Sequence, residues 1–263
     1  MSIWSAGRYE AVAQRIAGIA EEVVAAVARR APLLDSAVVD LASGTGSAAL
    51  AAAERGARVT AVDITPELLA IGAEKAAAAG VTVSWVSADA ADTGLPASSF
   101  DAAVSNMGVI FVEPAAQVAE LTRLLKPGAV VGFSSWVRDT VNPLYDPIVS
   151  VLGAPPARGY TPDQWGDPAI TAERLSASFG SLEFAPGRHP WRFPSQAQAL
   201  TFVTQESPMH VDILGKLAPG QRSALVAAFD AALGDCVGDD GEVVFNASYV
   251  VVTAVRHGNA DSS

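Results

Sequence analysis

The chain has 263 residues, 50% of them hydrophobic, and its 17 basic and 28 acidic residues give a formal net charge of -11. This length can bury the core of one large domain, and charged residues interrupt every apolar run before it reaches the roughly 18 to 20 residues of a membrane span, so no membrane partner is expected. The acidic balance, without any basic run, also argues against a nucleic-acid partner.

The predicted elements begin with an amphipathic helix over 10–30, where apolar residues recur at helical spacing. Apolar, β-branched runs then predict strands. These runs are 37–42, 58–63, 81–86, 100–106 and 129–137. Thr65 as N-cap, Pro66 as first helical residue and Gly80 as left-handed C-cap delimit the helix between the second and third runs. Strands alternating with helices predict an α/β fold with a parallel sheet.

The pattern changes after Trp136. The segment 138–168 contains six prolines and several large aromatic residues, which predicts a lid inserted after the fifth strand, over the open end of the sheet. Helical patterns follow at 168–180, 195–206 and 219–233, and the β-branched run 242–256 is typical of a final strand. The tail 258–263 is expected to be disordered. Substrate choice is expected to depend on aromatic walls, for which the candidates are Trp136, Tyr145, Tyr160, Trp165 and Trp191.

The small-residue loop after the first predicted strand is the candidate binding site. Gly44 and Gly46 remove side chains where a ligand must approach the backbone, and ligands of open parallel sheets bind at the carboxyl ends of the strands. A dinucleotide would use Gly44, Gly46 and Ala49 as a G-x-G-x-x-A fingerprint, with Asp63 on the ribose. An adenosyl sulfonium without phosphates would instead use the D-x-x-x-G-x-G pattern that Asp40 opens.

Three observations favour the sulfonium. Asp40 places a carboxylate close to where a pyrophosphate would lie, and this charge would attract the ammonium of a methionyl group instead. Asp89 follows the third predicted strand, where a second acid can meet the adenine edge. No cationic clamp lies near these loops in the sequence. The predicted cofactor is therefore S-adenosylmethionine, and the alternatives are an NAD(P)-dependent Rossmann oxidoreductase or a non-catalytic S-adenosylmethionine-binding protein.

Four stretches, taken together and in order, resemble the class I S-adenosylmethionine-dependent methyltransferases, in the branch similar to the ubiquinone/menaquinone-biosynthesis type. They are VVDLASGTG, VTAVDIT, SADAADTGLPASSFDAAVSNMGVIFV and LLKPGAVVGFSSW. The resemblance covers residues 4–137 well. It implies a Rossmann-like, seven-stranded, mostly parallel sheet flanked by helices, with the last strand antiparallel. Ala42 departs from the glycine that is common in this family and would crowd the methionine end slightly.

The cofactor contacts follow from these positions. Asp63 is expected to accept both ribose hydroxyls, because Thr65 already fills the alternative role of N-cap. Asp89 and Ala90 are expected to meet the amine and ring nitrogen of adenine, with a plain turn as the alternative. Asn106 is expected to face the methyl-transfer region, or else to be a turn residue. The complete set of predicted cofactor-binding residues is Tyr9, Asp40, Ala42, Gly44, Gly46, Asp63, Ile64, Asp89, Ala90 and Asn106.

Methyl transfer from a sulfonium is an in-line displacement that mostly needs alignment and exclusion of water. A hydroxyl acceptor would also need a base, whereas a phenolate or free amine would not. His210 is the only histidine considered for that role, with a packing histidine as the alternative, and the catalytic residues otherwise stay unknown. The expected acceptor is a small molecule, and the methylated atom (oxygen, nitrogen, carbon or sulfur) is left open.

The remaining predictions concern compartment and organisation. The N-terminus carries Arg8, Glu10 and Arg15 among its apolar positions, unlike a secretory signal, so a cytoplasmic protein is expected. Cys236 is the single cysteine, which excludes an intrachain disulfide, and no metal is assigned. A homodimer is left open. One domain is expected over 1–263, with a helical segment (1–34), a cofactor-binding core (35–137), a lid region with helices (138–240) and a final strand (241–257).

Overall fold

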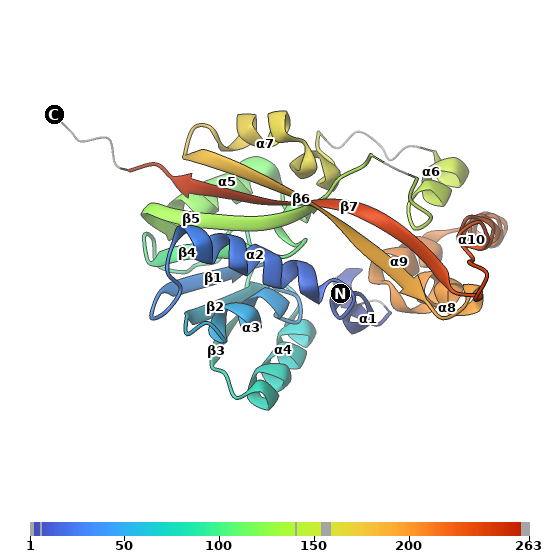
Figure 1. Cartoon of the computed structure of the whole chain (residues 1–263), viewed down its shortest axis with the longest axis horizontal. Coiled ribbons are helices and arrows are strands. Elements are labelled where there is room, and N and C mark those ends of the chain that lie inside the picture. The colour runs from blue at the N-terminus through green and yellow to red at the C-terminus, as the bar shows by residue number, and fades with distance from the viewer. Residues whose placement is uncertain (1–2, 6, 140, 154–158, 259–263) are drawn as a thin grey trace. The chain divides into compact units, whose positions relative to one another are not determined.

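The structure is a computed structural model that describes residues 3–5, 7–139, 141–153 and 159–258 (Figure 1). Residues 140 and 154–158 of the predicted lid, and 259–263 of the predicted tail, lie outside the described residues. The chain forms two compact units. Unit 1 comprises 1–15, 139–159 and 188–248, and unit 2 comprises 16–138, 160–187 and 249–263. The strands β6 and β7 run from one unit into the other, and the domain boundaries drawn from the sequence stay a prediction.

A seven-stranded sheet has the order β3-β2-β1-β4-β5-β7-β6. The strands are β1 (Ala37–Leu41), β2 (Arg58–Asp63), β3 (Val83–Ser87), β4 (Phe100–Ser105), β5 (Leu125–Trp136), β6 (Phe179–Phe193) and β7 (Val243–Arg256). The first five pair in parallel, and β7 pairs antiparallel to β5. The predicted Rossmann-like sheet with an antiparallel last strand is confirmed.

The strand order reverses between β1 and β4. From β1 the chain moves to β2 and β3 on one side, and it then returns to β4 and β5 on the other side. The crossover connections therefore leave the sheet in opposite directions at the carboxyl ends of β1 and β4. Such a switch point is where open α/β sheets bind ligands.

Helices cover both faces of the sheet in unit 2. Figure 1 shows α2 in front of the sheet and α5 behind it, with α7 at the top of the view. The helices of this unit are α2 (Ala17–Arg30), α3 (Ser47–Ala53), α4 (Pro66–Ala79), α5 (Pro114–Leu124) and α7 (Pro168–Leu175), with short 3-10 turns η2 (Val109–Phe111) and η3 (Pro162–Gly166). Pro66 begins α4 and Gly80 ends it in the left-handed conformation, at φ 69°, as predicted.

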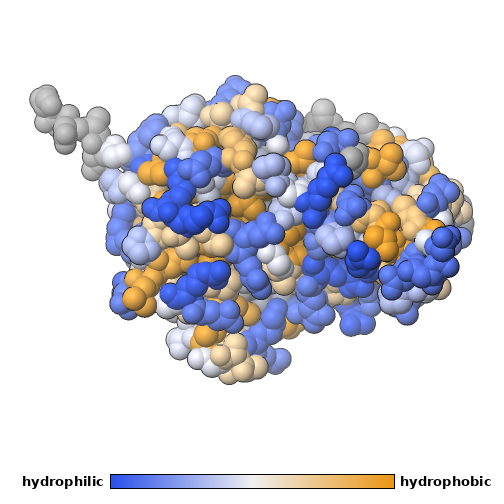
Figure 2. Space-filling model, viewed as in Figure 1, coloured by the Kyte–Doolittle hydropathy of each residue, from blue (hydrophilic) through white to orange (hydrophobic). Residues whose placement is uncertain are grey.

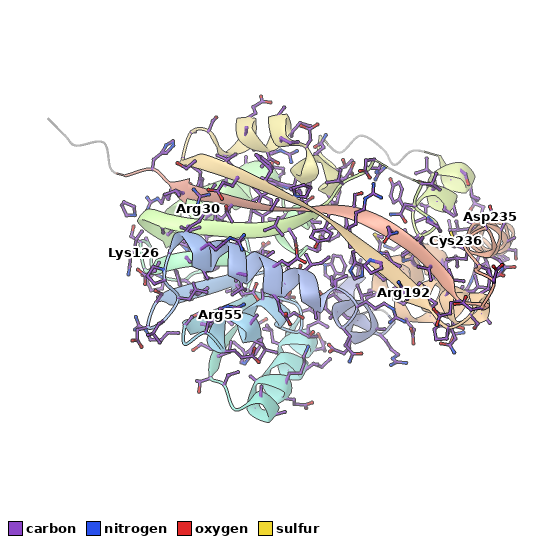
Figure 3. All side chains as sticks on the ribbon, in the orientation of Figure 1. Arg30, Arg55, Lys126, Arg192, Asp235 and Cys236 are labelled. Atoms are coloured by element: carbon purple, nitrogen blue, oxygen red, sulfur yellow. The ribbon has the colours of Figure 1, made fainter. Side chains whose placement is uncertain are left out.

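The end of α2 is fixed to the sheet by a basic residue. Arg30 donates from Nη1 to the Thr253 hydroxyl of β7 at 2.9 Å and lies 3.6 Å from the Glu183 carboxylate of β6 (Figure 3). A cation in the last turn also suits the helix dipole. This contact holds α2 against the antiparallel part of the sheet.

Unit 1 is mostly helical and has an aromatic core. Its elements are η1 (Ile3–Ser5), α1 (Tyr9–Ala13), α6 (Asp146–Leu152), α8 (Gln196–Thr201), the π-helix η4 (Phe202–Glu206), α9 (Pro208–Lys216) and α10 (Pro219–Gly234). Trp191, Phe193 and Phe202 pack against one another, and the Arg15 guanidinium lies 4.9 Å from the Phe193 ring and 5.0 Å from that of Phe202. Cys236 follows α10 (Figure 3), and burial raises the pKa of its thiol.

Three sequence predictions differ from the structure. The single helix expected over 10–30 is interrupted between α1 and α2, because Arg15 packs on the aromatic rings of unit 1 while Ile16 is buried in unit 2. The sequence analysis also missed β6, α6 and α9. Pro127 and Gly128 predict from the sequence that the helix beginning near Pro114 ends at 126–128, but α5 already ends at Leu124 and these residues lie inside β5.

The lid predicted over 138–168 is not confirmed. Its residues divide between the two units. Trp165 in η3 is only 1% exposed and makes an edge-to-face contact with Phe133 at 5.4 Å, so it belongs to the core of unit 2. Trp191 belongs to the core of unit 1. Trp136 packs edge-to-face on Tyr249 in unit 2. A substrate contact by the other aromatic candidates, Tyr145 and Tyr160, stays a prediction.

Hydrophilic and apolar residues are interspersed on the face shown in Figure 2. Within the described ranges, the structure has no helix that is both long and apolar enough to cross a membrane. Large hydrophobic side chains that are exposed are few, and Ile64, at 57% exposure, follows directly after β2.

Candidate functional site

The glycine loop connects β1 to α3 through three left-handed residues. Ala42, Gly44 and Gly46 have φ values of 52°, 56° and 80°. Glycine adopts this region without strain, whereas the Cβ of Ala42 makes it unfavourable. Gly46 is also the N-cap of α3. The loop therefore turns sharply at the switch point and presents backbone there.

Asp63 joins the end of β2 to this loop. Its carboxylate is 6% exposed; Oδ2 accepts the Gly44 amide and Oδ1 accepts the Thr65 amide, both at 2.8 Å. Thr65 is the N-cap residue of α4, as predicted, but its hydroxyl makes no cap hydrogen bond and is buried without a partner among the described residues. Asp63 therefore also orders the turn into α4.

Asp40 lies inside β1, beneath the loop. It is fully buried, and its Oδ2 accepts the Ala49 amide of α3 at 2.9 Å. Burial raises its pKa well above 3.8; the Ala49 hydrogen bond opposes this shift, and the nearby charge of Asp63 adds to it. Oδ1 has no hydrogen-bond partner among the described residues. Asp40 thus offers a buried acceptor that a cationic ligand group would stabilise in its charged form.

The indole of Trp85 packs against the glycine loop. The sequence analysis did not predict Trp85 as a site residue. A Cβ added to Gly46 would lie 2.5 Å from Cη2 of this indole, and a Cβ added to Gly72 of α4 would lie equally close. Both glycines are therefore needed for the indole of β3 to fit. The signal was present in the sequence as two glycines and one tryptophan, but only the fold brings them together.

The end of β4 lies against the end of β1. The Ser105 hydroxyl donates to the Leu41 carbonyl at 2.7 Å and accepts the Val109 amide at 3.0 Å. A Cβ on Gly108 would lie 2.3 Å from the Ala42 carbonyl oxygen. Ser105 and Gly108 therefore bring the loop after β4 into contact with the glycine loop, and the sequence analysis had assigned neither.

Asn106 is held by the protein through both atoms of its amide. Nδ2 donates to the Ile16 carbonyl at 3.2 Å, and Oδ1 accepts the Ser134 hydroxyl of β5 at 2.8 Å. The residue lies at the carboxyl end of β4, as predicted. Its contact with the cofactor stays a prediction.

The loop after β3 carries the predicted adenine contacts. Asp89 is exposed, and its Oδ1 accepts the Ala91 amide at 2.8 Å, so the residue does form the turn that was its alternative role. One carboxylate oxygen remains for a ligand. Ala90 is buried, and its carbonyl accepts the Gln117 amide of α5 at 3.4 Å.

Two predicted residues lie in unit 1. Tyr9 makes an edge-to-face contact with Trp4, with ring centroids 6.2 Å apart. The His210 ring is 4% exposed, with Nδ1 2.6 Å from the Ser207 hydroxyl and Nε2 2.7 Å from the Leu144 carbonyl. Burial lowers the pKa of His210 to about 4, against the opposing effect of the Leu144 carbonyl. These contacts occupy both ring nitrogens, as in a packing histidine.

Comparisons with known proteins identify the family of this chain. Residues 38–128 match the model of a methyltransferase domain. An uncharacterized protein of Mycobacterium tuberculosis is 31% identical over 195 residues, which are 71% of this chain and 68% of that protein. A demethylmenaquinone methyltransferase of Clavibacter sepedonicus is 39% identical over 99 residues, which are 37% of this chain and 40% of that enzyme. The chain belongs to the class I S-adenosylmethionine-dependent methyltransferases.

The methyltransferase is similar to the menaquinone-type branch, as the sequence predicted. Its cofactor is S-adenosylmethionine, the methyl donor of this family, which sets aside the dinucleotide alternative. The fold is shared with the Haemonchus contortus phosphoethanolamine N-methyltransferase 2, at a TM-score of 0.54 and 20% identity, over 89% of this chain and 52% of that one. The methyltransferase thus spans about half the length of that enzyme.

Proposed function

We propose that the chain transfers the methyl group of S-adenosylmethionine to a small-molecule acceptor, with the cofactor bound across the carboxyl ends of β1, β2 and β3. The observation that carries the proposal is the geometry of Asp63. Each carboxylate oxygen accepts one backbone amide at 2.8 Å and retains the capacity for a second hydrogen bond. Two acceptor positions on one rigid carboxylate suit two neighbouring ribose hydroxyls.

The other residues fit the remaining parts of the cofactor. Ile64, exposed directly after Asp63, offers an apolar surface to the purine face. Asp89 and Ala90 offer a carboxylate oxygen and a backbone amide to its polar edge. Asp40 offers its buried, unpartnered Oδ1 to the methionyl ammonium. The side chains of this site are rich in carboxylates, which attract a cation and would repel a pyrophosphate.

When bound, the cofactor supplies a methyl group that is already activated as a sulfonium. The chain therefore needs to orient the acceptor and exclude water, and orientation alone can supply on the order of 7 to 11 kcal/mol. No step is assigned to His210, because its ring nitrogens are engaged by Ser207 and Leu144. An acceptor that is itself ionised, such as a phenolate, would react without a protein base.

The acceptor is proposed from charge and from similarity. A net charge of -11 disfavours nucleic acid and other polyphosphates. The relative in Clavibacter sepedonicus is named for demethylmenaquinone, so reduced naphthoquinones are the first acceptors to assay, although that similarity spans only 37% of this chain.

The proposal is tested by following the methyl group. Purified protein is incubated with tritium-methyl S-adenosylmethionine and, in separate reactions, with a reduced naphthoquinone, a mixed small-molecule extract, duplex DNA and transfer RNA. Transfer into a small-molecule fraction, and not into nucleic acid, is expected. Transfer into nucleic acid alone would contradict the proposal, and binding without transfer to any acceptor would favour the non-catalytic alternative.

A further inference from the structure

The segment 88–99 connects β3 to β4 without a helix. It carries Asp89 and Ala90, the residues proposed to meet adenine. Its own hydrogen bonds around Asp89 form only a tight turn, in which Asp92 donates its amide to the Asp89 carbonyl at 3.0 Å. A segment this long, with little internal structure, needs external contacts to hold one conformation.

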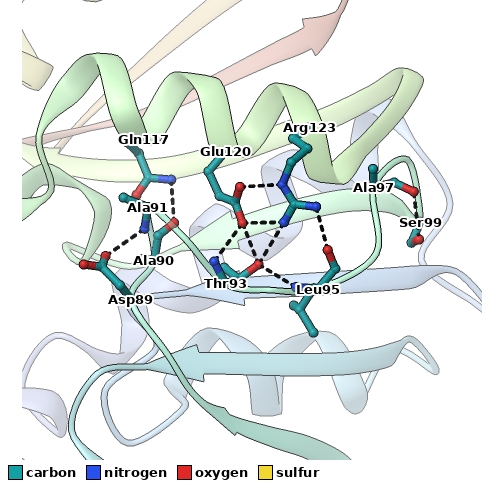
Figure 4. A network of polar contacts seen from close by, with 10 residues as sticks. All are labelled: Asp89, Ala90, Ala91, Thr93, Leu95, Ala97, Ser99, Gln117, Glu120 and Arg123. Carbon is teal, nitrogen blue, oxygen red and sulfur yellow. Dashed lines mark hydrogen bonds and ion pairs between the residues drawn. The ribbon is translucent and has the colours of Figure 1, made fainter.

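One face of α5 provides these contacts (Figure 4). The side chains of Gln117, Glu120 and Arg123 are spaced three residues apart, so they lie along one side of the helix. Gln117 holds the Ala90 carbonyl, as described above. Arg123 donates from Nη1 to the Leu95 carbonyl at 2.6 Å. Between these two contacts, Glu120 binds Thr93.

Glu120 is the centre of this cluster. Its Oε1 accepts both the Thr93 amide at 2.9 Å and the Thr93 hydroxyl at 2.6 Å. Arg123 donates Nε to Oε2 and Nη2 to Oε1, each at 2.7 Å. The Glu120 side chain is 5% exposed, and burial by itself raises its pKa, yet the hydrogen bonds from Arg123 and Thr93 lower the pKa to about 2. The carboxylate is thus held charged in a fixed position.

We propose that Glu120 and Arg123 are positioning residues that set the affinity of the cofactor site and its selectivity for adenine. They act through the segment 89–95, and neither is assigned a contact with the cofactor. The proposal rests on the proposed placement of adenine at Asp89 and Ala90. If the cluster is broken, the segment samples other conformations. The apparent affinity is then the intrinsic affinity multiplied by the fraction of molecules that keep the binding-competent conformation.

The variants are Arg123→Ala, which removes the bidentate partner, and Glu120→Gln, which keeps a carbonyl acceptor for Thr93 and loses the charge. Arg123→Lys is the conservative variant, and it also serves if Arg123→Ala fails to fold. The matched control is Lys126→Ala (Figure 3), which breaks a different ion pair, to Asp101 at 2.6 Å, where β4 and β5 begin. This pair lies at the amino ends of these strands, whereas the site lies at the carboxyl ends of the parallel strands.

Affinities are measured by calorimetry for S-adenosylhomocysteine and for S-inosylhomocysteine, whose base has an oxygen in place of the adenine amine. Amide hydrogen exchange of residues 88–96 is followed in parallel. We expect Arg123→Ala and Glu120→Gln to bind S-adenosylhomocysteine about tenfold more weakly, which corresponds to one tenth of the molecules holding the competent loop. The inosyl analogue lacks the amine that the segment is proposed to contact, so its affinity should depend less on the ordered segment and the preference for the adenosyl ligand should shrink. Exchange in 88–96 should accelerate, and Arg123→Lys should recover part of the loss.

The Lys126→Ala control should leave both affinities and this exchange unchanged. Unchanged affinity and base preference in Arg123→Ala and Glu120→Gln, despite faster exchange, would overturn the proposal and leave the cluster a merely structural role. Equal weakening of both analogues would also overturn the assignment to adenine selectivity. If wild type itself fails to bind S-adenosylhomocysteine, it is the proposed function that fails, and this outcome is distinguishable from the others.

Discussion

Asp63 accepts the Gly44 amide through Oδ2 at a distance of 2.8 Å. Because Asp63 ends β2 and Gly44 lies in the loop after β1, this hydrogen bond joins the two neighbouring strand ends at which the cofactor is proposed to bind. The Thr65 amide holds the other oxygen at the same distance. The carboxylate is therefore preorganised for a ligand, which reduces the entropy that binding must overcome.

Asp40→Asn should stabilise the ligand-free protein at neutral pH and weaken cofactor binding. The pKa of Asp40 is raised by burial, so the native state holds its proton more tightly than the unfolded state does, and stability is lost as pH rises from the unfolded pKa to the native one. Each tenfold difference in acidity corresponds to about 1.4 kcal/mol. Urea unfolding across mildly acidic to neutral pH should show that the stability of Asp40→Asn relative to wild type increases as the pH rises.

The same variant should bind S-adenosylhomocysteine more weakly, because the ligand ammonium loses a counter-charge. In wild type, binding at mildly acidic pH should release a proton from Asp40, which calorimetry in buffers of different protonation enthalpy can detect. Unchanged affinity in Asp40→Asn, with no proton release in wild type, would show that Asp40 only orders the loop.

Ala42→Gly should stabilise the protein by about 0.5 to 1 kcal/mol, because Ala42 has a φ of 52° that glycine adopts without a Cβ penalty. The matched control is Ala70→Gly, at an exposed position inside α4, which should destabilise by a similar amount. Both are read from denaturant midpoints. A loss of stability in Ala42→Gly as large as in the control would show that the left-handed backbone at this position is not strained.

Gly46→Ala should destabilise the protein by about 1 to 3 kcal/mol. The new Cβ would lie 2.5 Å from the Trp85 ring, and the backbone of residue 46 has a φ of 80°, which is unfavourable for alanine. Adding Trp85→Leu should relieve the steric part of the loss and leave the backbone part. Urea unfolding of the single and double variants separates the two contributions. If the double variant loses the full sum of both single effects, the indole does not pack against this glycine.

His210 should contribute a loss of stability as the pH falls from about 6.5 to about 4, which is measured as the difference in stability between wild type and His210→Gln. Burial lowers its native pKa to about 4, so the unfolded state takes up a proton in this range and the native state does not. The loss should amount to roughly 3 kcal/mol. His210→Gln should remove this pH dependence, and His257→Gln, at an exposed position, should not. If methyl transfer in His210→Gln falls steeply while the protein stays folded, the ring has a catalytic role after all.

The parallel strands and the glycine loop were predictable because each is encoded locally. A β-branched run and a turn with Gly44 and Gly46 lie within one short stretch of sequence, and Asp63 ends the next run. By contrast, β6 contains Pro186 and Pro190, which argue against a strand unless it lies at a sheet edge, where this one does. Edge position is a property of the assembled sheet, which the local pattern does not contain.

The contacts that support the site could not be predicted from local sequence patterns for the same reason. Trp85 of β3 packs against Gly46 of the glycine loop and Gly72 of α4, so the three residues come from three different parts of the chain. The sequence alone indicates that Glu120 is an exposed acid on a helix. Only in the fold does the segment between β3 and β4 bring Thr93 into contact with it. Such partners are far apart in the chain, and a single sequence carries no signal that pairs them.

The most direct test of the account is the affinity for S-adenosylhomocysteine compared with its 2′,3′-dideoxy analogue, in wild type and in Asp63→Ala. Glu74→Ala, an exposed acid on α4, is the matched control. If Asp63 holds the ribose, wild type and the control should prefer the natural ligand by about tenfold to a hundredfold, or roughly 1.5 to 3 kcal/mol, and Asp63→Ala should bind both ligands equally weakly. The same preference in all three proteins would contradict the placement of the cofactor at the ends of β1 and β2.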